Sequence, residues 1–394
     1  MSKISAKYCG CWDAVSGYGS ANRNFIMALD TVGVELTTQR VSYSKNYGES
    51  FYGETYKLAQ EKEGKAINYD IKIIHIPCDS YLRYLEPCKY HIGHLFWETD
   101  RMSPEWVWNC NLMDEIWVGD NFHKEAFEKS GVKRPVWVFP QPVNTEMTDR
   151  KIKRFMLKGV KDASNDHFLF YSIFQWIERK APKILLTAYW QEFANEKNVG
   201  LLLKTYKERY LPEEKKELLD QIRLWKSELN QATYPPVYFY SEFDDVDDVF
   251  RVHQTGDCFV LSHRGEGWSR CIAEAMVMGK PVIATQLGGI HDFLTKETYF
   301  PLKWKPINVF NMDWAPWYRK DQKWAEPDMG ELRRLMRFVY ENQGEAFQTA
   351  KRGQEFVKRN FSYEAVGRML KDRLIDIQKM INRERRKKIR WLPL

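Results

Sequence analysis

The sequence predicts an α/β protein of two doubly wound domains that face each other across a cleft. Along both halves of the chain, short apolar runs of strand length alternate with segments of helical periodicity, a pattern typical of parallel sheets with crossover helices. A polar stretch at residues 144–167 separates the two series and is expected to be the linker. The length of 394 residues suits two or three domains.

The first half of the chain carries three short runs with the composition of buried strands. They are residues 71–76 (IKIIHI), 115–118 (EIWV) and 136–139 (VWVF). Helical patterns at residues 25–29, after a glycine-rich turn, and at 122–129 fill the space between strands. This alternation predicts a first domain over residues 1–155.

The second half repeats the alternation with five further apolar runs that we expect to be strands. They lie at residues 168–173, 200–203, 237–240, 258–261 and 281–284. A long helical pattern occupies 213–229, and the chain is helical and increasingly basic from about residue 331. We therefore predict a second domain over residues 165–365, followed by a basic helix or tail over 366–394.

The composition is that of a soluble globular protein, with 44% hydrophobic and 29% charged residues. No window approaches the ~20 apolar residues of a membrane span, and the N-terminal MSKISAKYCG lacks the apolar core of a secretion signal. The seven cysteines have no zinc-site spacing, which favours a reducing compartment. We expect a cytoplasmic protein, whose net charge of +7 is compatible with an anionic ligand.

The most informative stretch is SHRGEGWSRCIAEAMVMGKPVIATQLGGIHD, at residues 262–292. It follows a predicted strand, passes through a loop with Gly265 and Gly267, and enters a helix. Such a helix N-terminus offers free N–H groups and a positive dipole end to a diphosphate. Glu266 lies in the loop, and Glu274 lies eight positions later on the helix, where a carboxylate can accept hydrogen bonds from a ribose diol. These features favour a nucleotide-sugar site.

This stretch resembles the paired-glutamate motif, Glu-x7-Glu, of retaining glycosyltransferases, specifically glycosyltransferase family four (group 1). Further matches lie along nearly the whole chain. They are SGYGSANRN at 16–24, WETD at 97–100, WIERK at 176–180, WAEPD at 324–328 and NFSYEAVGRML at 360–370, the last two matching the closing helices. The resemblance implies the GT-B fold, with two facing Rossmann-like domains and a last helix that crosses back to the N-terminal domain.

The resemblance also implies roles for individual residues. Lys180 would hold the diphosphate, Glu274 the ribose, and Glu266 would lie near the donor sugar and the reaction centre. The remaining predicted donor ligands are the N-terminal glycine loop and the backbone N–H groups of the Glu266 loop. They are Gly17, Gly19, Gly267, Trp268 and Ser269.

Several positions depart from the family pattern. Phe174 stands where many members have an arginine six residues before the diphosphate lysine, and Arg179 and Lys204 are the candidates for the missing charge. Glu98, preceded by His91 and His94, stands nearest to the place of a histidine at a strand end, so we assign it a catalytic role of unspecified kind. EGWSR replaces the usual EGFGL, so sugar selectivity is expected to differ.

We expect neither a metal nor a cofactor beyond the nucleotide-sugar co-substrate. The acidic run DDVDDV at 244–249 looks like a metal motif, but such runs are usually solvated, and folds of this type generally need no metal. His75, His123 and His253 are isolated in the sequence and are predicted to be structural.

The sequence thus predicts a metal-independent hexosyl- or pentosyltransferase that moves a sugar from a nucleotide-diphosphate donor such as a UDP-sugar. The acceptor would be a hydroxyl of a glycan, a lipid-linked glycan or a modified nucleic-acid base. The alternatives are a sugar-nucleotide epimerase on the same fold and an inactive nucleotide-sugar-binding module. The basic tail allows three hypotheses: it binds an anionic membrane surface, it binds a nucleic acid, or it is a solvated terminus. Its residues are Arg383, Arg385, Arg386, Lys387, Lys388 and Arg390, followed by Trp391 and Leu392.

Overall fold

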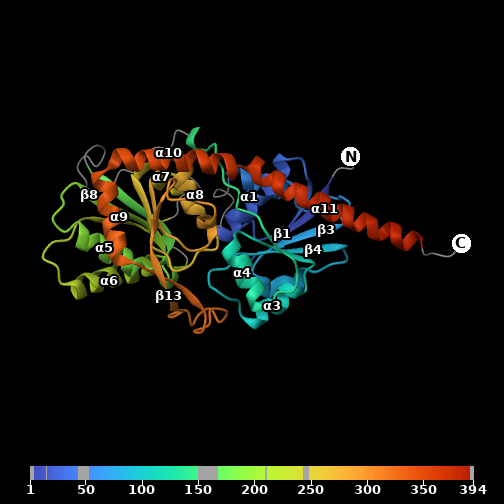
Figure 1. The fold of residues 1–394 in the computed structure, drawn as a ribbon, viewed down its shortest axis with the longest axis horizontal. Coiled ribbons are helices and arrows are strands. Elements are labelled where there is room, and N and C mark those ends of the chain that lie inside the picture. The colour runs from blue at the N-terminus through green and yellow to red at the C-terminus, as the bar shows by residue number, and fades with distance from the viewer. Residues whose placement is uncertain are drawn as a thin grey trace. The chain divides into compact units, whose positions relative to one another are not determined.

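The computed structural model describes residues 4–14, 16–42, 53–149, 167–208, 211–242 and 248–390. The chain forms two compact units, each with its own sheet (Figure 1). The first unit combines Met1–Thr145 with the C-terminal segment Arg359–Leu394, and the second is Glu146–Lys358. The C-terminal segment therefore belongs to the unit that begins the chain, not to the one that precedes it.

The first unit is built on a six-stranded parallel sheet of order β2-β1-β3-β4-β5-β6. Its strands are β1 (Ser5–Gly10), β2 (Glu35–Arg40), β3 (Ile71–His75), β4 (Tyr90–His94), β5 (Glu115–Val118) and β6 (Val136–Val138). Its helices are α1 (Gly17–Thr31), α2 (Gly53–Glu61), α3 (Pro104–Asn111), α4 (Asn121–Ser130) and α11 (Tyr363–Arg390). Side-chain caps fix two of these starts: Ser16 accepts from Gly19 N–H, and Asp120 accepts from His123 N–H.

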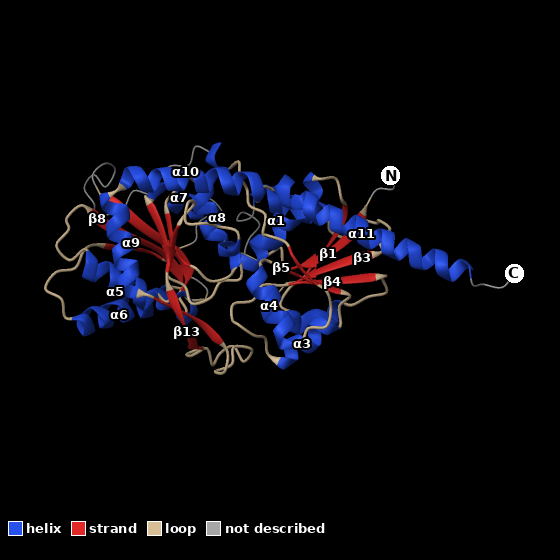
Figure 2. Ribbon diagram, viewed as in Figure 1, coloured by secondary structure: helices blue, strands red, loops and turns tan. Residues whose placement is uncertain are grey.

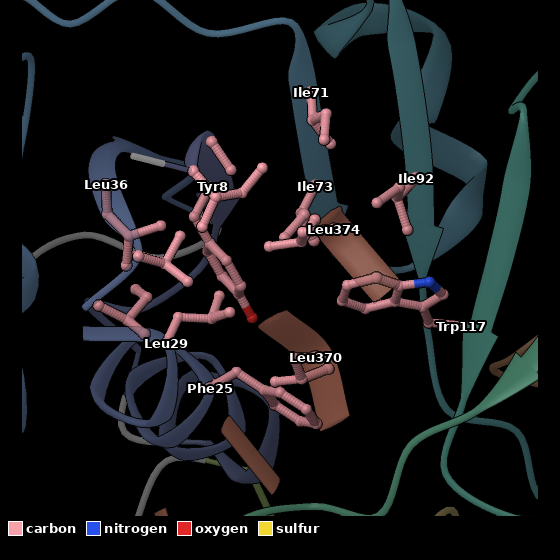
Figure 3. Packing of buried hydrophobic residues seen from close by; sticks show 14 of the residues in the cluster. Tyr8, Phe25, Leu29, Leu36, Ile71, Ile73, Ile92, Trp117, Leu370 and Leu374 are labelled. Carbon is pink, nitrogen blue, oxygen red and sulfur yellow. The ribbon is translucent and has the colours of Figure 1, made fainter. Parts of the chain in front are cut away.

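Helix α11 is part of the hydrophobic core of the first unit (Figure 3). Leu370 and Leu374 are fully buried and belong to the same cluster as Phe25 of α1 and Trp117 of β5. Burying a leucine side chain contributes roughly 1.5–3 kcal/mol. The helical spacing of apolar residues in this segment is therefore explained by packing in the first unit.

The second unit is built on another six-stranded parallel sheet, of order β12-β11-β10-β7-β8-β9. Its strands are β7 (Phe168–Gln175), β8 (Val199–Tyr206), β9 (Val237–Tyr240), β10 (Cys258–Leu261), β11 (Val282–Thr285) and β12 (Phe300–Leu302). The helices are α5 (Pro182–Glu192), α6 (Pro212–Leu229), α7 (Asp248–Thr255), α8 (Arg270–Val277) and α9 (Met329–Glu341); α10 (Gln343–Asn360) leads into the C-terminal segment. In both units helices flank the strands (Figure 2).

The strands predicted from apolar runs are confirmed as β3, β5 to β11, within a few residues at their ends. Three strands of the first unit, β1, β2 and β4, were not predicted, because polar residues interrupt their apolar pattern. One prediction is wrong: WAEPD, which was matched to the closing helices, does not lie within a helix. Trp324 lies in strand β14 (Lys323–Pro327), which pairs antiparallel with β13 (Trp304–Asn308), and only Asp328 caps the following α9.

No helix within the described part of the chain is long and apolar enough to cross a membrane. Most of the predicted linker, residues 150–166, lies outside the described residues, as do Trp391 and Leu392 of the basic tail.

Candidate active site

The predicted donor residues follow two neighbouring strands of the second sheet. The strand order reverses between β7 and β10, and ligands of doubly wound sheets bind at such a switch point, beyond the carboxyl ends of the strands. Lys180 lies in a short 3-10 helix (Glu178–Lys180) just after β7, and Glu266 lies in the loop after β10. Glu274 follows on α8. The fold thus brings together residues that are far apart in the sequence.

Lys180 and Glu266 form an ion pair within this edge. Their side chains are only 12% and 10% exposed, so both charges are largely withdrawn from water. A lysine held next to a carboxylate can exchange that partner for a phosphate oxygen when an anionic ligand enters. The pair therefore combines a cation for a leaving phosphate with a carboxylate close to it.

Two arginines brace the loops that carry this pair. Arg264 N–H donates to the carbonyl of Arg179 at 2.7 Å, and Arg179 Nη1 donates to the carbonyl of Gly265, also at 2.7 Å. Arg179, predicted as a phosphate ligand, thus also holds the backbone of the Glu266 loop. These bonds fix the distance between the end of β7 and the loop after β10.

Sequence reasoning missed the buried guanidinium of Arg264. It forms ion pairs of 2.8 Å with both Glu178 and Glu326, and it lies 4.9 Å from the ring centroid of Phe310. A buried arginine held by two carboxylates makes a rigid clamp between the β7 loop and the β13–β14 hairpin. The only signal in the sequence is a basic residue in the loop that follows the predicted strand at 258–261.

Glu274 is buried in a network of charged and polar side chains. Arg270 Nη1 donates to Glu274 Oε1 at 2.6 Å, and His253 Nε2 lies 3.6 Å from Oε2. The Tyr171 hydroxyl is 2.9 Å from His253 Nδ1. Burial raises the pKa of Glu274, but Arg270 and His253 outweigh it and leave this pKa below its usual value. His253, which is isolated in the sequence, therefore belongs to this buried network in the folded chain.

A pair of buried histidines lies between the Glu266 loop and the turn after β11. The Nε2 atoms of His263 and His291 are 3.4 Å apart, and burial lowers both pKa values well below the usual range, so both rings are neutral. Gly289 has φ +60°, and a Cβ there would lie 2.9 Å from the carbonyl oxygen of Trp268. Only glycine allows this close approach of the two backbones.

The Glu266 loop ends in a strained residue. Ser269, at the N-cap of α8, has φ 71° and ψ 58°, a left-handed conformation that costs a non-glycine residue roughly 1–2 kcal/mol. Its hydroxyl is buried and has no hydrogen-bond partner among the described residues. Gly267 and Trp268, the other predicted backbone donors, are also buried. An unpartnered polar atom on a strained loop is typical of a ligand site.

Two further predicted positions lie near this edge. Lys204, on β8, is 2% exposed; its Nζ donates to the carbonyl of Glu242 at 2.7 Å and lies 4.3 Å from the ring centroid of Tyr240. Phe174, on β7, is buried and stacks on Trp176, with 5.9 Å between ring centroids. The place of the missing arginine is therefore filled by an apolar side chain that packs in the unit.

The corresponding edge of the first unit is aromatic rather than charged. His75 ends β3 and His94 ends β4; the two are partners in the sheet register, and their rings stack at 3.9 Å. Phe25 packs edge-on against His94, and the Tyr8 hydroxyl is 2.5 Å from His75 Nδ1. Burial lowers the pKa of His94 to about 3 and that of His75 well below its usual value. His75, which is isolated in the sequence, is thus part of a buried aromatic cluster in the folded chain.

Glu98 and the glycine loop lie at this edge too. Glu98 is half-buried in the segment between β4 and α3, four residues after His94. Gly19 is in the first turn of α1, where a Cβ would lie 2.0 Å from the carbonyl oxygen of Ala14. Gly17 meets no described atom within 4 Å of such a Cβ. Gly19 is therefore required by packing, whereas Gly17 lies in open space.

Within the described ranges, no group of three or more His, Cys, Asp or Glu side chains could hold a metal ion. The acidic run predicted as a solvated metal-like motif, residues 244–249, lies mostly outside the described residues.

One known protein family matches a large part of the second unit. Residues 166–302, within the second unit, match the family of group 1 glycosyl transferases. No curated protein matches the chain.

Solved structures share the fold at low sequence identity. Sucrose-phosphate synthase from Thermosynechococcus elongatus has a TM-score of 0.67 and 14% identity, over 96% of this chain and 100% of that one. A glycosyltransferase from Rickettsia africae gives 0.66 and 14%, with the same coverage. HepE from Anabaena, solved with UDP-glucose, gives 0.64 and 12%, over 95% of this chain and 100% of its own. These likenesses show the fold alone, which is that of GT-B glycosyltransferases with a Rossmann-like sheet in each unit.

Proposed function

We propose that this chain, a glycosyltransferase with a group 1 domain in its second unit, transfers a sugar from a UDP-sugar to an acceptor hydroxyl with retention of anomeric configuration. The observation that carries the proposal is the gathering of Lys180, Glu266 and Glu274 at the switch point of the second sheet. HepE, which has a similar fold, binds UDP-glucose, and this supports UDP as the nucleotide.

In the proposed mechanism the second unit binds the donor and stabilises its leaving group. Glu274 accepts hydrogen bonds from the ribose diol. Lys180 leaves Glu266 and neutralises the diphosphate, while the N–H groups at the start of α8 face its oxygens. Such preorganised charges act mainly on the transition state, where the leaving phosphate carries most charge.

Retention would follow from attack on the face that the diphosphate leaves. The departing phosphate accepts the proton of the acceptor hydroxyl, and Glu266 lies beside the sugar as the C–O bond breaks. The acceptor thus becomes a glycoside and the donor a nucleoside diphosphate. The protein contributes positioning and electrostatic stabilisation rather than a covalent intermediate.

Stereochemistry tests this proposal without knowledge of the acceptor. The chain is incubated with UDP-α-glucose, UDP-α-N-acetylglucosamine or UDP-α-galactose, and slow hydrolysis is followed by proton NMR. Retention predicts that the α-anomer of the free sugar appears before mutarotation. Release of the β-anomer first would contradict retention, and conversion of one UDP-sugar into another would identify an epimerase.

We also propose that the leaving-group charge is met by side chains and the α8 terminus, without a divalent cation. Hydrolysis of the preferred UDP-sugar should therefore persist in EDTA. Loss of activity that Mg²⁺ or Mn²⁺ restores would contradict this and direct attention to the acidic run at 244–249.

For the acceptor, the exposed basic end of α11 favours an anionic glycan carrier. Arg383 and Arg385 are exposed, and Arg385 forms an ion pair of 3.0 Å with Asp70. Deletion of residues 383–394 should reduce binding to vesicles containing anionic phospholipid and leave donor hydrolysis unchanged. If the deletion instead reduces binding to DNA, and if DNA binding by the full chain weakens steeply as salt is added, the acceptor is a nucleic-acid base.

A further inference from the structure

Arg270 occupies a specific place in the candidate donor site. It is the first residue of α8 and lies one helical turn before Glu274, to which its Nη1 donates at 2.6 Å. The Arg270 side chain is 22% exposed, whereas that of Glu274 is 6% exposed. The arginine is therefore the partner that an entering ligand can reach.

The hydrogen bonding of this ion pair is incomplete. Arg270 Nε is buried and has no hydrogen-bond partner among the described residues, and the same is true of Glu274 Oε2. His253 Nε2 lies 3.6 Å from that oxygen, too far for a hydrogen bond. Buried polar atoms normally find partners, so these unpaired atoms indicate groups that a ligand would complete.

The proposed function makes Arg270 and the ribose compete for Glu274. A ribose diol that donates both of its hydroxyls to Glu274 uses the unpaired Oε2 and also Oε1, which Arg270 now occupies. Separating a guanidinium from its carboxylate in a largely buried site costs free energy, unless another anion takes the place of that carboxylate. The diphosphate attached to the same ribose is such an anion, and arginine binds phosphate oxygens bidentately.

Besides Lys180, two other predicted cations already donate to backbone carbonyls, and the position before them lacks a charge. Lys204 Nζ donates to a backbone carbonyl, Arg179 Nη1 bonds the carbonyl of Gly265, and Phe174 brings no charge. Arg270 directly follows Ser269, whose buried hydroxyl has no partner among the described residues. The side chain therefore starts beside the loop proposed to hold the phosphates.

We propose that Arg270 binds the donor diphosphate, and that Glu274 holds it in place until the ribose displaces it. This inference rests on the proposed function and assigns a second cation, besides Lys180, to the same site. It also gives a role to Arg270 in EGWSR, at the position where the usual family motif, EGFGL, has an apolar leucine.

The first test compares UDP, UMP and uridine by isothermal titration. Arg270→Leu should weaken UDP binding roughly tenfold to hundredfold, as expected for a charge-assisted hydrogen bond of about 1.5–3 kcal/mol. Uridine, which lacks phosphate, should bind equally well or more tightly, because Glu274 is no longer engaged. Arg270→Lys should recover part of the loss. Equal weakening for all three ligands would show a merely structural role and overturn the inference.

A matched control removes the same charge elsewhere in the unit. Lys183 lies on α5 in an exposed ion pair with Glu228. Lys183→Leu should change UDP affinity less than about twofold, since exposed pairs contribute little. If it weakens UDP binding as much as Arg270→Leu does, only the net charge matters and the inference fails.

A second test addresses the exchange, with inorganic pyrophosphate as the probe. Glu274→Gln frees Arg270, so pyrophosphate should bind severalfold more tightly while uridine binds more weakly. The gain should disappear in the Arg270→Leu/Glu274→Gln double variant, because the two residues are coupled. A gain of the same size with or without Arg270 would overturn the exchange.

The outcomes separate this inference from the function it rests on. If the wild-type chain binds none of UDP, GDP and ADP, the proposed function fails, and the inference fails with it. If the wild type binds UDP and Arg270→Leu binds it unchanged, the inference alone is wrong.

Discussion

The two sheets of this protein have closely related topologies, but their functional edges differ in chemistry. In the second unit, Lys180 and Glu266 lie in the segments that follow two strand ends and Glu274 lies on α8, and their charges are paired within the candidate site. In the first unit, the corresponding edge carries His75 and His94, stacked and neutral. A shared architecture therefore does not fix the chemistry. Function resides in the loops that each sheet carries.

The difference has a physical consequence for each unit. A charged edge can bind and stabilise a diphosphate, and its residues affect transition-state energy more than folding. The neutral rings of His75 and His94 pack against the hydrophobic core of the first unit, so these residues affect folding first. The predictions below test this division, from the largest expected effect to the smallest.

The largest effect is expected in the core of the first unit. Leu374→Ala removes a fully buried side chain of α11 and should destabilise the first unit by about 2–5 kcal/mol. Chemical denaturation monitored by circular dichroism measures this. Met369→Ala, at a 43% exposed position on the same helix, is the control and should change stability little. Equal effects of the two changes would mean that α11 does not form part of the core.

At the charged edge, Lys180→Ala should lower kcat by about 100- to 1000-fold, equivalent to roughly 3–4 kcal/mol of transition-state stabilisation. The melting temperature should change far less, because the lysine acts mainly on the leaving phosphate. Donor hydrolysis with Lys183→Ala as the control checks this. Near-normal turnover would mean that Arg270 or Arg179 neutralises the phosphate without Lys180.

The neutral histidines should make the first unit sensitive to acid. Burial lowers the pKa of His94 to about 3 in the folded chain, against 6.5 for an unperturbed histidine. Above pH 6.5 the His94 imidazole is neutral in both the folded and the unfolded state, so this residue does not lower the free energy of unfolding. Below pH 6.5 His94 is protonated in the unfolded state but stays neutral in the folded state. The free energy of unfolding therefore falls as the pH falls from about 6.5 to about 3. At pH 5 the loss is about 2 kcal/mol for this one residue.

His94→Phe should remove this part of the pH dependence while keeping an aromatic ring in the stack. Urea denaturation of the variant and the wild type at pH 7 and pH 5 measures the change. His167→Phe, which removes a histidine with a solvent-exposed hydrogen bond in the second unit, is the control. An unchanged pH dependence in His94→Phe would show that other groups determine acid sensitivity.

The smallest effect is expected from the strained residue of the donor loop. Ser269→Gly should stabilise the second unit by about 0.5–1 kcal/mol, because glycine adopts φ 71° without steric cost. Asn230→Gly, at φ 46° at the end of α6, relieves a similar conformation away from the site. Ser269→Gly alone should also alter donor affinity. A fall in melting temperature would mean that the Ser269 hydroxyl contributes more than its backbone strain costs.

The sequence by itself determined most strands of the two α/β sheets and indicated the candidate donor motif. Strand and helix periodicities are local, so runs such as residues 71–76 and 258–261 identify buried strands without knowledge of their partners. Glu266 and Glu274 could be proposed for the same reason, since a loop and the helix that follows it are contiguous in the chain. A local pattern cannot, however, distinguish the strand β14 from a helix, because β14 exists through its pairing with β13.

Only the tertiary structure decided which distant residues meet. Lys180 and Glu266 are 86 positions apart, and they pair because β7 and β10 are adjacent in the sheet. His75 and His94 stack because the register of β3 and β4 places them opposite each other. The basic C-terminal helix belongs to the first unit because its apolar residues complete that unit's core. Long-range contacts depend on strand order and register, which no single segment encodes.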